Sequence, residues 1–366
     1  MDDARSGWGA WIGLKAVPGV GNALGVALVR AFGGPEAAFV ARDADLQRAG
    51  VRRDVRAALR AFDRWRDVDL QLARLDRLGG RLVTWTDASY PDLLRHIHDP
   101  PLFLHAYGDF APADAHAVAV VGSRDASPYG RQMTAQLVEP LAASGITIVS
   151  GMARGIDAAA HAAALRARGR TIAVLGSGID VVYPSEHHQL HMQIAKHGAV
   201  VSEYPMGAQP DGENFPGRNR IISGLALGTI VVEATDRSGS LITAGYATEQ
   251  GRDVFAVPGP VGVRTRGTHH LLRQGAGLVE SAEDVLREIA PHLRVAGARP
   301  VLPPVTDAEA AVLAHLDEMP RDVDALIGAT GLSAGSVLET LLLLELRGLV
   351  RQLPGQQFAR GGAAVH

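Results

Sequence analysis

Short apolar runs alternate with longer amphipathic stretches through the middle of the chain. The apolar runs lie at residues 117–122, 146–151, 171–176, 199–204, 229–234, 253–259 and 277–281. Strands buried on both faces of a parallel sheet have such nearly continuous apolar sequences, and stretches with helical spacing, such as 129–143 and 154–168, fill the gaps. The pattern predicts an α/β fold with a Rossmann-like, doubly wound, mostly parallel sheet over residues 77–292. Two earlier runs, 82–85 and 102–104, are expected to extend this sheet.

Residues 1–76 have apolar positions at helical spacing and predict a helical domain of the helix-hairpin-helix or SAM-like type. The segment Val17-Pro18-Gly19-Val20-Gly21 forms the expected tight turn between two helices. Two interpretations stay open for this turn. Its glycine amides could face a DNA phosphate, or it could be a plain αα-hairpin.

Residues 293–304 are rich in Pro and Arg, lack periodicity and are expected to form a linker. Beyond it, Thr306 and Glu309 form a capping box that starts the first helix of a winged-helix-like domain over residues 305–366. The helix after Ser333 begins without a side chain that reads bases. This domain is therefore expected to bind a protein partner or act as an auxiliary module. The alternative is a duplex DNA contact through Arg351 and Arg360.

Composition limits the chemistry that this chain can perform. It has 366 residues and no cysteine, which excludes disulfides, Cys-ligated zinc and a thiol nucleophile. Neither a signal peptide nor an apolar run of ~18 residues is present, so we expect a cytoplasmic protein with no membrane segment. The net charge is −3, and the only lysines are Lys15 and Lys196. Any nucleic-acid site must then be a local arrangement of arginines and backbone amides.

Glycine, serine and arginine concentrate where the predicted strands end, and these carboxyl ends are where open α/β sheets bind ligands. Glycines allow close approach to the backbone, helix N-termini favour anions, and arginines bind phosphate. Ordinary turns could explain one such motif, but five successive motifs favour several phosphates along a groove, as in a polynucleotide. The candidate DNA-binding residues are Gly122, Ser123, Arg124, Ser150, Gly151, Arg154, Gly176, Gly178, Phe215, Arg218, Asn219, Arg220, Ser238, Gly239 and Ser240.

Individual side chains in this set have more than one possible role. Arg124, Arg154, Arg218 and Arg220 are expected to clamp the DNA backbone together, although Arg220 could instead pair with a structural carboxylate such as Glu233. Phe215 could stack on a base or pack in the core.

The motifs GSR at 122–124, SGMARGID at 150–157, FPGRNRIISGL at 215–225 and EQGRDVFAVPG at 249–259 occur in this order. With others between residues 80 and 290, they make the chain resemble the DNA-processing protein A family (DprA or Smf). The resemblance implies a core that binds single-stranded DNA, protects incoming or processed strands and forms a homodimer. It also implies loading of the RecA recombinase in natural transformation and recombination, with no catalytic activity and no cofactor. One departure is Ser185-Glu186, where many relatives carry a basic residue.

Several enzyme classes fit this sequence less well. A dinucleotide site needs G-x-G-x-x-G after the first strand, and this chain has GSRDAS. A nucleotide-hydrolysing enzyme on a related fold is the alternative function, with Arg220 and either Glu233 or Glu249 as reacting groups. His187, His188 and His191 could suggest a metal, but a solvated helix face is the favoured interpretation. We therefore predict no catalytic residue and no metal site.

Overall fold

The computed structural model describes residues 2–291, 306–317, 320–346, 349–353 and 355–360. The chain divides into two compact units, Met1–Gly297 and Ala298–His366, which are described separately. The predicted linker at 293–304 lies outside the described residues.

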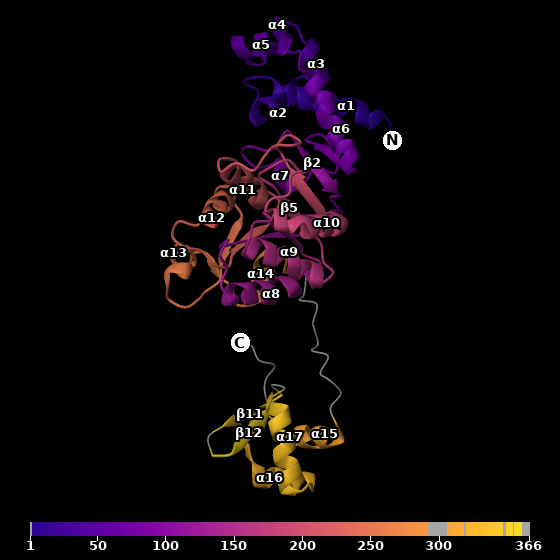
Figure 1. The fold of residues 1–366 in the computed structure, drawn as a ribbon. Helices are drawn as coiled ribbons and strands as arrows, with labels where there is room; N and C mark the ends of the chain where they lie inside the picture. Colours follow the sequence, from indigo (N-terminus) through magenta and orange to yellow (C-terminus); the bar gives the residue numbers. More distant parts are fainter. Residues whose placement is uncertain (1, 292–305, 318–319, 347–348, 354, 361–366) are drawn as a thin grey trace. The chain divides into compact units, whose positions relative to one another are not determined.

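A twisted sheet lies at the centre of the first unit (Figure 1). Among the residues described it has nine strands in the order β1-β2-β6-β5-β4-β3-β7-β8-β9. Its strands are β1 (Arg81–Thr84), β2 (Phe103–Gly108), β3 (Ala117–Val121), β4 (Thr147–Ser150), β5 (Thr171–Val174), β6 (Ala199–Ser202), β7 (Gly228–Val231), β8 (Asp253–Ala256) and β9 (Gly277–Leu278). From β6 to β9 all neighbours are parallel, whereas β1 and β2 extend the sheet by antiparallel pairing. The predicted mostly parallel α/β sheet is confirmed.

Helices cover both faces of this sheet because successive strand residues point to opposite sides. On one face, Val118 and Val120 pack against α8 (Pro128–Ala143), α9 (Ile156–Arg166) and α14 (Ala282–Ile289). On the other face, Ala119 and Val121 pack against α7 (Asp92–Arg95), α11 (Asn214–Gly224) and α12 (Gly239–Glu249). The remaining helices of the core are α10 (His188–His197) and α13 (Arg266–Arg273).

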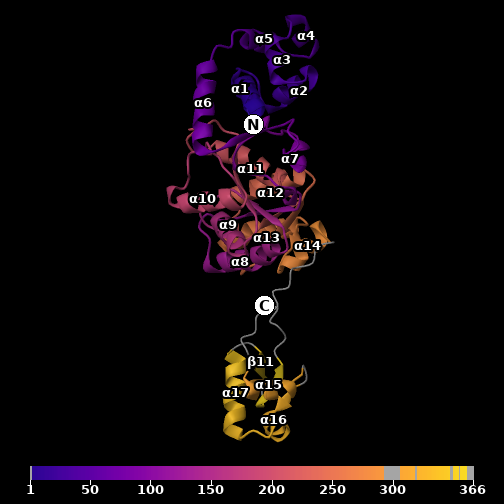
Figure 2. The ribbon, with the colours of Figure 1, turned by 90° about the vertical axis from the view of Figure 1, so that its right-hand side faces the viewer.

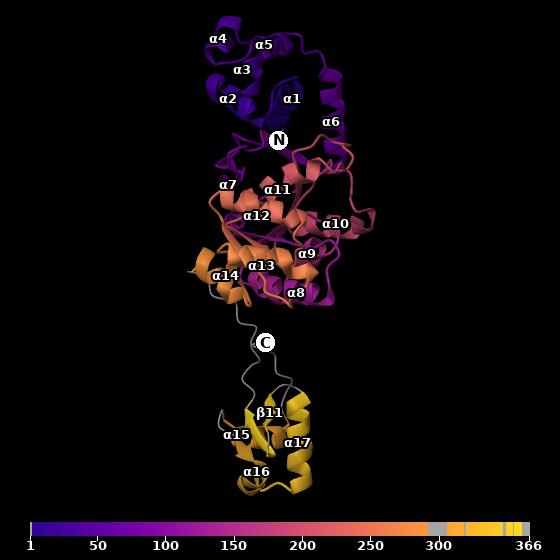
Figure 3. The ribbon, with the colours of Figure 1, turned by 90° about the vertical axis from the view of Figure 1, so that its left-hand side faces the viewer.

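The N-terminal helices gather at one end of the core, and α6 runs from this group to the sheet (Figures 2 and 3). They are α1 (Asp2–Ala16), α2 (Asn22–Phe32), α3 (Pro35–Val40), α4 (Asp43–Arg48), α5 (Arg53–Arg60) and α6 (Trp65–Leu78). They share one apolar cluster with residues of the α/β core, among them Leu102, Phe103 and Ile179. Close packing explains Gly25, because a Cβ there would lie 2.9 Å from Leu102 Cδ2.

The second unit has the arrangement of a winged helix, as predicted. It comprises α15 (Asp307–Ala314), α16 (Val323–Thr330), α17 (Ala334–Leu346) and the strands β10 (Arg321–Asp322), β11 (Val350–Leu353) and β12 (Gln357–Arg360). The Thr306 side chain caps α15 in the expected capping box with Glu309.

Among the residues described, no single helix is long and apolar enough to cross a membrane. The pair Val323–Thr330 and Ala334–Glu345 reaches that length and composition only together, with a bend of 112° between them.

Candidate nucleic-acid interface

Strand order reverses between β3 and β7, since the chain passes from β3 through β4, β5 and β6 on one side and then returns to place β7 on the other. Such a reversal leaves a crevice at the carboxyl ends of the strands, where open α/β sheets bind ligands. A cavity of about 680 Å³ lies there. A smaller one of about 100 Å³ at the ends of β4 and β5 shares Arg124, Ala153, Tyr183 and Phe215 with it. We call the two cavities together the switch-point groove.

The first wall of the groove is the turn after β3, where Arg124 is exposed and lines both cavities. Gly122 permits this turn, because a Cβ there would lie 2.6 Å from Ile156 Cγ1. Ser123 N donates a 2.7 Å hydrogen bond to the Glu233 carbonyl oxygen, which ties the turn to the end of β7. Among the described residues, no carboxylate oxygen forms an ion pair with Arg124. Its guanidinium is thus available to a phosphate.

Asp157 organises the loop after β4. Its Oδ2 accepts hydrogen bonds from Gly151 N at 3.1 Å and Ala153 N at 3.4 Å. Burial raises the pKa of this carboxyl, and Arg218 partly offsets the effect. Gly155 closes the loop with φ +79°, and a Cβ there would lie 2.1 Å from Ser123 O. The sequence places Asp157 at the start of a helix after glycine-rich residues, a signal that could have identified it as a site residue.

The side chain of Arg218 forms a buried part of the groove lining. Its guanidinium is buried and donates to the carbonyl oxygens of Gly151, at 2.8 Å, and Val174. Burial lowers the pKa of Arg218 to about 10. Phe215 covers it, with the Arg218 guanidinium carbon 5.7 Å from the ring centroid and that of Arg124 at 5.1 Å. Arg218 therefore joins the ends of β4 and β5, and Phe215 is half-buried between two cations.

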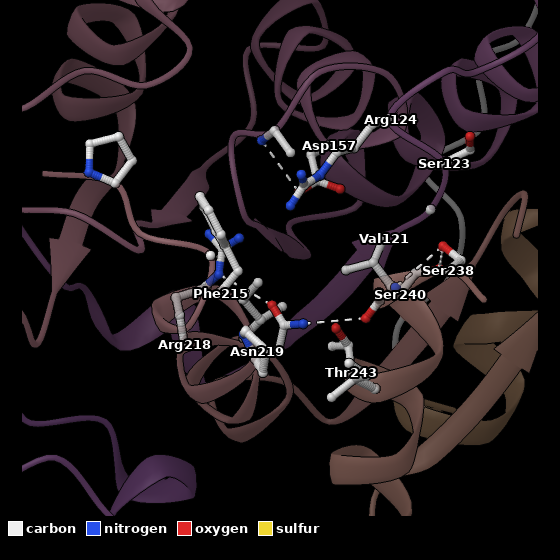
Figure 4. Close-up of a pocket in the computed structure, with 18 of the residues that line it drawn as sticks. Val121, Ser123, Arg124, Asp157, Phe215, Arg218, Asn219, Ser238, Ser240 and Thr243 are labelled. Carbon is white, nitrogen blue, oxygen red and sulfur yellow. Dashed lines mark hydrogen bonds between the residues drawn. The ribbon is translucent and has the colours of Figure 1, made fainter.

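The opposite wall is the N-terminus of α12 (Figure 4). Ser238 caps this helix, and its Oγ lies 2.7 Å from Ser240 Oγ. Asn219 Nδ2 donates to the Gly239 carbonyl oxygen at 3.3 Å, which fixes the helix start to α11. Nothing lies within 4 Å of a Cβ built on Gly239. The start of α12 is thus open toward the cavity at Gly239, and the Ser240 and Leu241 amides donate to Ser238 Oγ and the Ser238 carbonyl oxygen. An open helix N-terminus favours anions.

Arg154 lies at the edge of the smaller cavity and is exposed, but it has a partner. Its Nε donates to Glu186 Oε1 at 2.6 Å. The hydrogen bond to Arg154 lowers the pKa of Glu186. Glu186 therefore places a carboxylate on a groove arginine.

Three predicted site residues do not face the groove. Arg220 is buried and forms ion pairs with Glu203, at 2.5 Å, and Asp99, at 3.0 Å. Ser150 is buried and its hydroxyl donates to the Val120 carbonyl oxygen. Gly178 packs against Pro205 O, 2.6 Å from a built Cβ. The four-arginine clamp is thus revised, because only Arg124 and Arg154 present exposed guanidinium groups here.

The groups of the alternative enzyme do not come together. The partners of Arg220 are Glu203 and Asp99, whereas Glu233 Oε2 accepts from Ser127 N at 2.9 Å and Glu249 is exposed on α12. The described residues hold no group of three or more His, Cys, Asp and Glu side chains suited to a metal. The predicted solvated helix face is wrong for His191. This side chain is buried, with Nε2 3.0 Å from the Ile179 carbonyl oxygen.

Comparisons with known proteins identify the family of this chain. Residues 81–290 match the family described as DNA recombination-mediator protein A, and residues 296–356 match the DprA winged helix domain. The putative DNA processing protein DprA of Mycobacterium tuberculosis is 38% identical over 392 residues, with 97% of each chain covered. DprA of Bacillus subtilis is 43% identical over 220 residues, with 60% of this chain and 74% of the relative covered.

Two solved structures are also similar. DprA from Streptococcus pneumoniae has a TM-score of 0.66 and 37% identity, covering 76% of this chain and 98% of that one. DNA processing protein A from Helicobacter pylori, solved to show its single-stranded DNA binding mode, has a TM-score of 0.53 and 29% identity, covering 58% and 98%. The chain therefore belongs to the DNA-processing protein A (DprA/Smf) family, in its form with a C-terminal winged helix domain.

Proposed function

We propose that this protein binds the backbone of single-stranded DNA in the switch-point groove and carries out no reaction on it. The observation that carries the proposal is the exposed Arg124 facing the open N-terminus of α12, at the point where strand order reverses. A guanidinium and a helix terminus both favour phosphate oxygens. Phe215 adds an aromatic surface for a base, a contact that accepts any sequence.

A band-shift comparison tests this proposal. Single-stranded and duplex DNA of the same sequence are titrated with the full chain at two salt concentrations. The single strand should bind more tightly, and its binding should weaken as salt rises because counterions are released from phosphates. Equal affinity for both forms of DNA would contradict the proposal.

The protein would then protect single strands and load RecA onto them during transformation and recombination. The match to DNA recombination-mediator protein A supports this role. The measurement is RecA filament formation on DNA coated by a single-strand-binding protein, with and without this chain. No acceleration by this chain would remove RecA loading while leaving DNA binding intact.

A homodimer through the edge of the sheet belongs to the same proposal. β9 is the last strand in the sheet order, and its Leu278 is 52% exposed. An edge strand that has no further partner among the described residues and carries a large apolar side chain favours contact with a second chain. Sedimentation at tens of micromolar should show a dimer, and Leu278→Glu should shift it to monomer.

The winged helix domain is proposed to contact a protein partner. Leu338, Leu342 and Leu343 on α17 are 46–57% exposed, whereas the start of that helix offers no base-reading side chain. Duplex binding through exposed Arg351 and Arg360 is the alternative. Band shifts of the double variant Arg351→Ala/Arg360→Ala with duplex DNA decide between them, since a loss of binding would favour the alternative.

A further inference from the structure

The helix α5 is strongly basic in a chain that is acidic overall. Residues 52–60 hold four arginines and one aspartate, a net charge of +3, whereas the whole chain carries −3. Val55 and Leu59 are buried and pack this helix into the N-terminal apolar cluster. Arg53 and Arg60 are seven positions apart, so they share the opposite side of the helix, and both are exposed. We call this side the α5 face. In Figure 1 it belongs to the helices that lie away from the sheet.

Neighbouring carboxylates offset only part of this charge. Asp43 of α4 pairs with Arg56 at 3.0 Å and is therefore shared when it also lies 3.6 Å from Arg60 Nε. Asp45, the other carboxylate of α4, pairs with two arginines of its own segment. Arg53 forms no ion pair with the residues that the structure describes. Exposed ion pairs contribute only ~0–1 kcal/mol, so the guanidinium groups of the α5 face are accessible to an anion.

The turn at residues 17–21 borders the α5 face. A Cβ built on Gly19, whose φ is +86°, would lie 2.8 Å from Val55 Cγ2 and 3.9 Å from Arg52 Nη2. Arg52 directly precedes α5 and is 73% exposed, and its partner Asp54, at 2.7 Å, is 66% exposed. The middle of the turn is exposed as well, and its glycines leave the backbone open to close approach. Of the two interpretations of this turn, the phosphate contact therefore gains a neighbouring cation.

Spacing and composition indicate that the anion is the backbone of duplex DNA. Arg53 and Arg60 are two helical turns apart, about 10 Å along the axis, between the widths of the minor and major grooves of ~6 and ~12 Å. Neither α4 nor α5 contains an aromatic residue, whereas sites for single strands combine cations with aromatic surfaces. The nearby rings of Phe39, Phe62 and Trp65 pack on one another, with centroids 4.9, 5.1 and 5.5 Å apart.

We propose that the α5 face, with Arg52 and the turn at residues 17–21, binds the phosphate backbone of duplex DNA without reading its sequence. The face shares no lining residue with the switch-point groove and lies outside residues 81–290, which match the family model. The inference is therefore independent of the proposed single-strand binding. Where both hold, one chain engages both parts of a junction between single-stranded and duplex DNA.

The test uses the full chain and two double variants, each of which removes two exposed arginines. Arg53→Ala/Arg60→Ala changes the α5 face. Arg166→Ala/Arg287→Ala, on α9 and α14, is the matched control, because these side chains are 56% and 69% exposed and each pairs with one carboxylate. Fluorescence anisotropy measures the affinity for a labelled blunt duplex of about 20 base pairs and for labelled oligothymidine. Both titrations are repeated between about 50 and 200 mM salt.

Duplex affinity should fall roughly tenfold or more in Arg53→Ala/Arg60→Ala, because two charge-assisted phosphate contacts are lost. The log–log salt slope should decrease by about 1.8 for two phosphates. The control variant should keep the duplex affinity of the wild type, and oligothymidine affinity should be the same in all three proteins. Arg53→Gln/Arg60→Gln retains long polar side chains and replaces the alanine variant if the melting temperature of that variant falls.

No duplex binding by the wild type at the lower salt concentration overturns the inference. Unchanged duplex affinity in Arg53→Ala/Arg60→Ala also overturns it, and a loss in Arg351→Ala/Arg360→Ala would then place the duplex site on the winged helix domain. An equal loss for oligothymidine, or equally strong competition by polyglutamate, would make the face a general polyanion or acidic-protein site and overturns the duplex assignment. Wild-type protein that binds duplex but not oligothymidine would remove the proposed single-strand function and leave the α5 face as it stands.

Discussion

Arg124 and Phe215 face each other across the switch-point groove, with the guanidinium carbon 5.1 Å from the ring centroid. This contact holds a cation and an aromatic surface side by side at the point where β3 ends and α11 begins. A phosphate and its base are also neighbours on a nucleotide. The pair is therefore suited to engage both parts of one nucleotide.

Arg124→Ala should weaken single-stranded DNA binding roughly tenfold, because one charge-assisted phosphate contact is lost. The log–log salt slope should decrease by about 0.7. The melting temperature should not change, since Arg124 is exposed and has no described ion pair. Arg48→Ala, on α4, is the control and should leave DNA affinity unchanged. An unaltered salt slope for Arg124→Ala would place the phosphate site elsewhere.

Arg218→Met should act mainly on stability. The variant leaves the carbonyl oxygens of Gly151 and Val174 without their buried donor, at a cost of roughly 1–3 kcal/mol for each unsatisfied group. The free energy of unfolding from denaturant titration should fall accordingly. A variant with wild-type stability and weaker DNA binding would show that Arg218 contacts phosphate directly.

Arg220→Met should reduce the free energy of unfolding by up to about 3 kcal/mol, because the largely buried Glu203 carboxylate is left without its cation. Adding Glu203→Gln should recover part of this loss, since the unpaired charge is then removed. Denaturant titration of the single and double variants measures the coupling. Equal losses in Arg220→Met and in the double variant would mean that the unpaired Glu203 carboxylate is not the source of the loss.

The contrast among these arginines marks the limit of sequence-based prediction here. The strands could be predicted because buried parallel strands have continuous apolar sequences, as at Ala117–Val121. Arg218 and Arg220 lie two positions apart in one short motif, so the local sequence does not reveal that their partners differ. The partners of Arg220 are 17 and 121 positions away, and only the tertiary fold brings them together. Strand β10 could not be predicted, because Arg321–Asp322 consists of two polar residues and shows no alternation of apolar and polar positions.

Glu186→Gln should strengthen single-stranded DNA binding by up to about fivefold. The substitution removes the carboxylate that accepts from Arg154 Nε at 2.6 Å, while exposed pairs contribute only ~0–1 kcal/mol. Glu139→Gln is a matched control, because Glu139 pairs with Arg166 at 2.7 Å with similar exposure, outside the groove lining. Fluorescence anisotropy of a labelled single strand measures both. Weaker binding in Glu186→Gln would mean that Glu186 positions Arg154 for DNA.

Stability should fall as the pH is lowered through the range in which unfolded histidine takes up protons. Burial lowers the pKa of His161 to about 3 and that of His105 to about 4. Both are below the ordinary value, so the folded state keeps these rings neutral. Their contribution is complete above pH ~6.5 and is lost progressively as the pH falls toward the folded pKa values. At pH 5 each histidine should lower the free energy of unfolding by ~2 kcal/mol relative to pH 7.

Burial of Asp157 raises its pKa and gives the opposite trend below its folded pKa, because protonation then favours the folded state. Denaturant titrations at pH 5, 6 and 7 measure the net slope, and His161→Leu should remove about half of the histidine contribution. A slope unchanged in that variant would mean that His161 can be protonated without unfolding the chain.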